Sequence, residues 1–131
     1  DANMQVRASA VEGLLRLGDI SAVLLAADLA KHPDPSIRAA AAHALAATSD
    51  KQAVAILQTL LQDQQPQPRL LAAKALGKSA APVTPLLKKV LQDSDVAIRL
   101  AAAGSLLQQL RRSTAVPSRL RKNNFGKAAL R

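Results

Sequence analysis

The stretch Asp34-Pro-Ser-Ile-Arg-Ala-Ala-Ala-Ala-His-Ala-Leu45 decides the fold of this chain, because it combines a helix start with a helical apolar face. Asp34 can accept hydrogen bonds from the free amides of a first helical turn, and Pro35 occupies the first helical position without losing a bond. The apolar residues recur at a spacing of three and four: Ile37, Ala41, Ala44 and Leu45. This spacing predicts an amphipathic helix over residues 35–47.

The same pattern returns along the chain with a nearly constant period. Its clearest marker is an arginine, found at intervals of 31, 31 and 30 residues: Arg7, Arg38, Arg69 and Arg99. Each arginine is followed three residues later by an alanine and seven residues later by a leucine (Ala10, Ala41, Ala72 and Ala102; Leu14, Leu45, Leu76 and Leu106). A fixed period of this length is typical of a stacked helical repeat protein.

The repeat predicts an all-α fold of seven helices, over residues 3–17, 20–32, 35–47, 50–63, 66–78, 82–93 and 95–111. Asp19 and Asp50 are expected to cap the helices that follow them, whereas Pro82 starts the sixth helix without a capping aspartate. Short connections make neighbouring helices antiparallel, and the stacked pairs are expected to form a right-handed α-solenoid. The many alanines favour helix and allow the helices to approach closely.

The stretches Asp34 to Leu45 and Asp95-Val-Ala-Ile-Arg-Leu-Ala-Ala-Ala-Gly-Ser-Leu106 resemble HEAT repeats, and so does Arg69-Leu-Leu-Ala-Ala-Lys-Ala-Leu-Gly77. They are most similar to the short bacterial kind that also occurs in phycobilisome lyases. The resemblance covers residues 1–111 and implies an opening half-repeat and three full repeats, with the arginine-bearing helix on the concave side. It also suggests a fragment of a longer solenoid. Residues 112–131 are then a basic tail, expected to be disordered in part or to form a short helix.

The resemblance implies a structural role for the four arginines. HEAT repeats often carry an aspartate six residues before the arginine, and the two form a ladder between successive repeats. Asp1, Asp63 and Asp93 hold this position, while His32 replaces the aspartate in the second repeat and leaves one rung in question. The alternative role is a row of arginines that binds phosphate or carboxylate groups of a ligand.

The composition argues against several kinds of catalytic site. The chain has 131 residues, with one Phe and no Cys, Trp or Tyr, so thiolate metal sites, cysteine nucleophiles and aromatic stacking on bases are not expected. The spacing of His32 and His43 does not suit a helical metal site, and no nucleophile elbow or glycine-rich phosphate loop occurs. We therefore predict a non-catalytic protein without cofactor or metal. An accessory domain of an enzyme such as a bilin lyase is an alternative that follows from the resemblance.

The arginine-bearing helices also suggest a binding surface. Residues one, five and nine positions after the arginines are expected on the concave side, and the chosen ones are Glu12, Arg16, His43, Leu70, Lys74, Lys78 and Leu100. Leu70 and Leu100, flanked by the two lysines, form an apolar strip with positive edges that suits an acidic, apolar peptide or partner helix. Alternatively, these leucines pack against an adjacent repeat or the tail.

The charge of the chain is concentrated near its end. Seven of the 18 basic residues lie in residues 111–131, which contain no acid: Arg111, Arg112, Arg119, Arg121, Lys122, Lys127 and Arg131. The nine acidic residues therefore face eleven basic ones in the repeats, a net charge of +2. The tail is expected to be a solvated segment or a contact for acidic protein, anionic lipid or, less favoured, nucleic acid. No signal peptide and no apolar stretch of about 20 residues occurs, so we expect a soluble, cytoplasmic protein.

Overall fold

The computed structural model describes residues 2–114, which contain seven α-helices and no strand. The helices are α1 (Ala2–Arg16), α2 (Ala22–Leu29), α3 (Pro35–Leu45), α4 (Lys51–Leu60), α5 (Pro66–Lys78), α6 (Thr84–Val90) and α7 (Val96–Thr114). The predicted all-α fold is therefore confirmed. Most helices are a few residues shorter than the predicted ranges.

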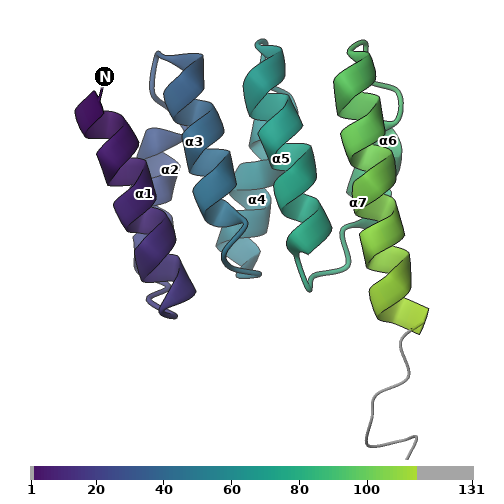
Figure 1. Cartoon of the computed structure of the whole chain (residues 1–131), viewed down its shortest axis with the longest axis horizontal. Coiled ribbons are helices and arrows are strands. Elements are labelled where there is room, and N and C mark those ends of the chain that lie inside the picture. Colours follow the sequence, from purple (N-terminus) through teal and green to yellow (C-terminus); the bar gives the residue numbers. More distant parts are fainter. Residues whose placement is uncertain (1, 115–131) are drawn as a thin grey trace, which may run out of the picture.

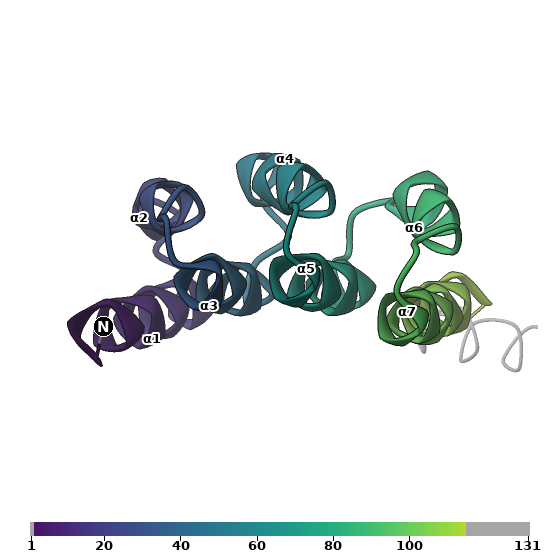
Figure 2. The ribbon, with the colours of Figure 1, turned by 90° about the horizontal axis from the view of Figure 1, so that it is seen from above.

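The helices form two layers (Figures 1 and 2). One layer holds α1, α3, α5 and α7 side by side, and the other holds α2, α4 and α6. The most extensive contacts join α3 to α5 and α5 to α7 within the first layer. Figure 2 shows that this layer bows, with α1 and α7 turned away from the second layer, so its outer side is the concave surface. This arrangement is the predicted α-solenoid.

Two of the aspartates that were predicted to cap helices do so. The side chain of Asp34 accepts a hydrogen bond from the Ser36 amide at 2.9 Å, and that of Asp50 accepts one from the Gln52 amide at 2.9 Å. The side chain of Asp19 also accepts a hydrogen bond from the amide two residues later, that of Ser21, at 3.1 Å, but α2 itself begins only at Ala22, with Ser21 as the N-cap residue.

Helix α6 starts two residues later than expected. It begins at Thr84, after an N-cap residue, Val83, that makes no side-chain capping bond. The proline in its first turn is Pro85, whereas Pro82 belongs to the preceding loop.

A glycine turn ends α1. Gly18 has a φ of +89°, a left-handed conformation that glycine adopts without steric cost. Its amide donates to the Leu15 carbonyl at 3.0 Å, and the Asp19 amide donates to the Leu14 carbonyl at 3.0 Å. These two bonds satisfy the last carbonyls of α1 and reverse the chain toward α2.

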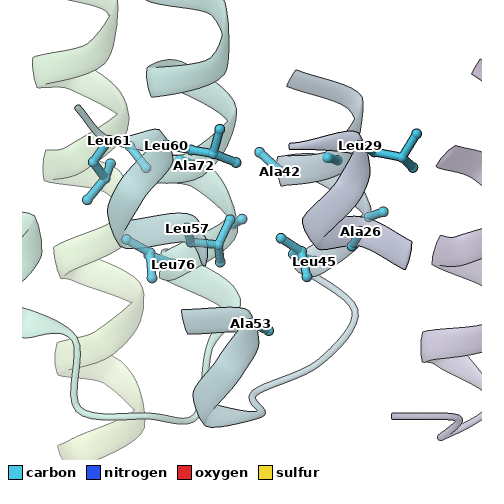
Figure 3. Packing of buried hydrophobic residues seen from close by; sticks show 14 of the residues in the cluster. Ala26, Leu29, Ala42, Leu45, Ala53, Leu57, Leu60, Leu61, Ala72 and Leu76 are labelled. Carbon is cyan, nitrogen blue, oxygen red and sulfur yellow. The ribbon is translucent and has the colours of Figure 1, made fainter. Parts of the chain in front are cut away.

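Alanine and leucine fill the space between the layers. Leu45, Leu57 and Leu76 point into this space and are at most 1% exposed (Figure 3). The alanines three residues after Arg38, Arg69 and Arg99 are fully buried, whereas Ala10 of α1 is exposed on the outer side of the first repeat. Close packing of small residues thus replaces the aromatic core that the composition does not provide.

The last helix continues beyond the predicted boundary between repeats and tail. Helix α7 runs to Thr114, and the side chains of Gln109 and Arg112 both donate to the Ser79 carbonyl at the end of α5. Arg112 therefore belongs to the repeats, and Arg111 is an exposed residue of α7. The other predicted tail contacts lie outside the described residues: Arg119, Arg121, Lys122, Lys127 and Arg131.

Candidate protein-binding surface

Two of the repeated arginines bridge successive repeats. Arg38 donates from Nε and Nη2 to the two carboxylate oxygens of Asp63, at 2.7 and 3.0 Å. Arg69 binds Asp93 in the same way, at 3.0 and 3.3 Å. The remaining nitrogen, Nη1, donates to the carbonyl six residues earlier. This carbonyl is that of His32 for Arg38 and that of Asp63 for Arg69. Each arginine is thus held by its own turn and binds the aspartate of the following repeat.

These contacts lower the pKa of both carboxyl groups. The hydrogen bond from Arg38 is the largest cause for the pKa of Asp63, which lies below its usual value although burial opposes the shift. Burial is the largest single influence on the pKa of Asp93 and raises it, but a backbone amide, the Arg69 hydrogen bond and the charges of Arg69 and Arg99 together lower it. Both carboxylates are ionised at neutral pH, and their geometry is that of structural ion pairs.

The rung that the sequence left in question is absent. Arg7 is exposed, binds no carboxylate among residues 2–114, and its guanidinium lies 3.9 Å from the sulfur of Met4. His32 keeps only the local part of the aspartate's role, because its Nδ1 accepts a hydrogen bond from the Asp34 amide at 3.0 Å. The corresponding amides donate to Asp63 and Asp93 in the other repeats.

A basic hollow opens on the concave surface between α3, α5 and α7. It encloses about 490 Å³, and none of the residues lining it comes from α2, α4 or α6. Leu71, Ala75 and Ala101 supply apolar surface, and His43, Lys74, Lys78, Ala46, Gly104, Ser105 and Gln108 complete the lining. Among residues 2–114, no acidic residue lines the basic hollow. Gly104 holds the position of His43 and Lys74 on α7, and a Cβ added there would meet no atom of another helix within 4 Å.

Three of the predicted surface residues, His43, Lys74 and Lys78, therefore line one site. Glu12 and Arg16 lie at its α1 side, where the Glu12 carboxylate accepts a hydrogen bond from Arg16 at 2.6 Å and lies 3.6 Å from His43 Nε2. The concave surface thus changes from paired charges on α1 to positive charges on α5 that have no ion-pair partner in the described part of the chain.

The expected strip of Leu70 and Leu100 is not on the concave surface. Leu70 is partly buried against the core, and Leu100 is 69% exposed but lies outside the basic hollow. The position after each arginine faces the following repeat, as the near-complete burial of Ala8 and Ala39 shows. Leu71, one residue later, supplies the apolar surface instead. One residue rotates a side chain by about 100° around a helix, so a small error of helical phase selected the wrong leucine.

Two other kinds of feature, a metal site and a membrane-spanning helix, were sought in the described part of the chain. Within residues 2–114, no group of three or more histidine, aspartate or glutamate side chains is arranged to hold a metal ion. None of the helices in this part of the chain has the length and apolar character to cross a membrane.

The two layers of antiparallel helices and the arginine–aspartate ladder define an α-solenoid of helical-hairpin repeats. The family model of HEAT repeats matches residues 1–76 and again residues 56–122, so the chain belongs to the HEAT-repeat family. Members of this family are typically protein-interaction scaffolds and are generally non-catalytic. A search among curated proteins matches none of them to this chain.

Proposed function

We propose that this chain is a non-catalytic, cytoplasmic interaction module that binds an acidic, partly apolar peptide or helix in the basic hollow. The observation that supports this most directly is the pair Lys74 and Lys78, which lie beside an apolar floor with no acidic residue among the described residues that line it. No cofactor takes part in this function.

The two lysines are suited to bind carboxylates of a partner. They are four residues apart on α5, so they lie on one side of the helix, about 6 Å apart at their Cβ atoms. Both are exposed, and neither forms an ion pair within residues 2–114. Because exposed charges add more to orientation and association rate than to affinity, the lysines select an acidic partner.

The floor of the basic hollow supplies the affinity. Leu71 is partly buried against the core and turns its remaining surface to the hollow, beside Ala75 and Ala101. An apolar side chain of the partner loses water contact there, which contributes about 25 cal/mol for each Å² buried. Helix α5, which carries Leu71 and Ala75, is packed between α3 and α7, so the site needs little ordering on binding.

The concave surface also orients the partner. Glu12 and His43 lie next to each other toward α1, whereas the lysines lie on α5. An acidic segment on the lysines therefore places the rest of the partner, carrying neutral or basic residues, toward Glu12.

Selection from a random displayed-peptide library against the full chain tests this function. We expect the enriched peptides to combine Asp or Glu with large apolar residues. Their binding to the double variant Lys74→Glu, Lys78→Glu should fall at least tenfold, whereas Lys88→Glu, Lys89→Glu should bind as well as the wild type. This control pair is exposed on α6 and carries the same change of net charge. Enriched peptides without acidic residues, or equal loss in both variants, would refute the proposal.

The nucleic-acid alternative has its own test. A salt titration with random-sequence DNA compares the full chain with a variant ending at Thr114. Binding by the tail predicts a steep loss of affinity with salt and no binding by the shorter variant. No binding of the full chain at low salt removes this alternative.

A further inference from the structure

A second hollow lies beside the basic hollow on the concave surface. It encloses about 280 Å³ between α1, α3 and α5, and its lining includes Gln5, Ser9, Glu12, His43, Gln67 and Leu71. We call it the acidic hollow, because Glu12 is the only Asp, Glu, Lys or Arg among the described residues that line it. The two hollows therefore offer opposite charges to a partner.

The two hollows form one groove, since His43 of α3 and Leu71 of α5 line both of them. On α3 and on α5 alike, the acidic hollow is lined by earlier residues and the basic hollow by later ones. Because α1, α3, α5 and α7 lie side by side in this order (Figure 1), the groove crosses the helices obliquely from α1 to α7.

The groove lies away from the surfaces through which repeats stack. In a solenoid each repeat contacts its neighbours along the direction of the stack, and a repeat placed beside α1 or α7 continues the concave surface without covering it. None of the residues that line the two hollows comes from α2, α4 or α6, the second layer of the stack. The groove is thus a feature of the concave surface itself.

Glu12 can accept a hydrogen bond from a partner in addition to the one it has. Its Oε1 accepts from Arg16 at 2.6 Å, whereas its Oε2 accepts none from residues 2–114 and lies 3.6 Å from Nε2 of His43. Each carboxylate oxygen has acceptor capacity for about two donors. Arg16 lines neither hollow, so it leaves Oε2 accessible to a basic side chain of the partner.

Exposed amide side chains lie along the groove: Gln5 and Gln67 in the acidic hollow and Gln108 in the basic hollow. None of the three is hydrogen-bonded through its side chain to another residue of the described part of the chain. A primary amide has both donors and an acceptor, so it can bind the N–H and C=O groups of a peptide backbone. Those groups are free in an extended peptide but are paired within a helix. The lining therefore favours an extended partner.

The distance between the two hollows also fits an extended segment. They are offset by one helix of the concave layer, and packed helices lie about 8–10 Å apart. In a polyproline II conformation, side chains three residues apart point to the same side and are separated by about 9 Å. An α-helix needs about six or seven residues to cover this distance, because it rises by only about 1.5 Å per residue.

We propose that the groove binds an extended peptide segment that carries charges of both signs. Acidic residues of this segment bind Lys74 and Lys78, and a basic residue three positions away binds Glu12. An apolar side chain between them covers Leu71, which both hollows share. The acidic end of this interaction rests on the proposed function, to which the second contact, the extended conformation and the spacing of the charges are added.

Fluorescence anisotropy with synthetic peptides tests this inference. Each peptide carries the anchor Leu-Glu-Glu in a neutral segment of serine and alanine, and a single arginine is moved along the segment. We expect the affinity to be highest with the arginine three residues from the nearer glutamate, about fivefold above that of the peptide without arginine, as for a favourable ion pair that is partly exposed. Highest affinity at six or seven residues, or no gain at any spacing, would overturn the inference.

Variants assign the gain in affinity to Glu12. Glu12→Gln should lose the gain from the arginine and bind the peptide without arginine as the wild type does. Asp28→Asn removes the same charge at an exposed position of α2 and should keep the gain. Equal loss of the gain in both variants would show a general effect of net charge and would also overturn the inference.

The same peptides separate this inference from the proposed function. If the peptide without arginine binds the wild type but not Lys74→Glu with Lys78→Glu, the proposed function is supported whatever the effect of the arginine. If the peptide without arginine binds and no arginine position increases the affinity, only the second contact is wrong. If no acidic peptide binds the wild type, the proposed function and the inference are both wrong.

Discussion

Replacing Gly77 by alanine tests how closely α5 and α7 approach. In an open helix this substitution stabilises by about 1 kcal/mol, because alanine is the better helix former. A Cβ at position 77, however, would lie 2.7 Å from Cβ of Ser105 and 2.6 Å from Oε1 of Gln108, and it would also meet Oγ of Ser105. Carbon atoms in contact are normally about 3.5–4.0 Å apart, so α7 has to move away by about 1 Å.

The atoms next to the added Cβ determine whether Gly77→Ala raises or lowers the free energy of unfolding. The Gln108 side chain can swing aside, but Cβ of Ser105 is attached to the backbone of α7, and its hydroxyl is buried and donates to the Ala73 carbonyl at 2.8 Å. Overpacking of this kind costs about 1–3 kcal/mol, which exceeds the gain in helix propensity. We therefore expect Gly77→Ala to lower the free energy of unfolding by about 1 kcal/mol.

Urea unfolding followed by circular dichroism measures this difference. Gly13→Ala and Gly104→Ala are matched controls, because both positions lie within helices and no atom lies within 4 Å of the added Cβ. They should raise the free energy of unfolding by about 0.5–1 kcal/mol. Ser105→Gly in the Gly77→Ala background should be less costly than Ser105→Gly alone, since it restores the space. A Gly77→Ala variant as stable as the controls would refute the close approach of α5 and α7.

Three further predictions concern the arginine ladder. Arg38→Ala should lower the free energy of unfolding by about 2 kcal/mol, whereas Arg7→Ala, which loses no carboxylate contact, should change it by less than about 0.5 kcal/mol. Equal losses of stability in urea unfolding would show that the ion pair with Asp63 is not the cause. His32→Asp should supply the absent rung and raise the free energy of unfolding by about 1 kcal/mol, a gain that has to disappear in an Arg7→Ala background if the reasoning is correct. Because the pKa values of Asp63 and Asp93 lie below the usual 3.8 in the folded chain, their pairs stabilise fully above about pH 4, and stability falls as the pH decreases further. Acid titration of the wild type and of the double asparagine variant should show a shallower acid transition in the variant, and identical profiles would exclude this cause.

The sequence alone was sufficient to predict the helices, the period of the repeat and the resemblance to the family. The signals that determine these features are local: Asp34 and Pro35 start a helix, and apolar residues at intervals of three and four define its buried side. Their repetition at a constant distance predicted the stacking of one repeat on the next. The family match then supports the resemblance seen in the same residues. Helix ends were less predictable, as α6 shows, because Val83 caps it through backbone geometry that no side chain signals.

Only the tertiary structure decided which surfaces remain open. Arg38 binds an aspartate 25 residues away in the following repeat, and this direction leaves Arg99 without a carboxylate among the described residues. Leu70 and Leu71 are both partly buried against the core, but only Leu71 also lines the basic hollow. Both outcomes depend on the angle at which one helix pair docks on the next, and that angle follows from side-chain packing across the whole contact. Local sequence determines that a helix is amphipathic, but the neighbouring repeat determines which part of its surface a partner can reach.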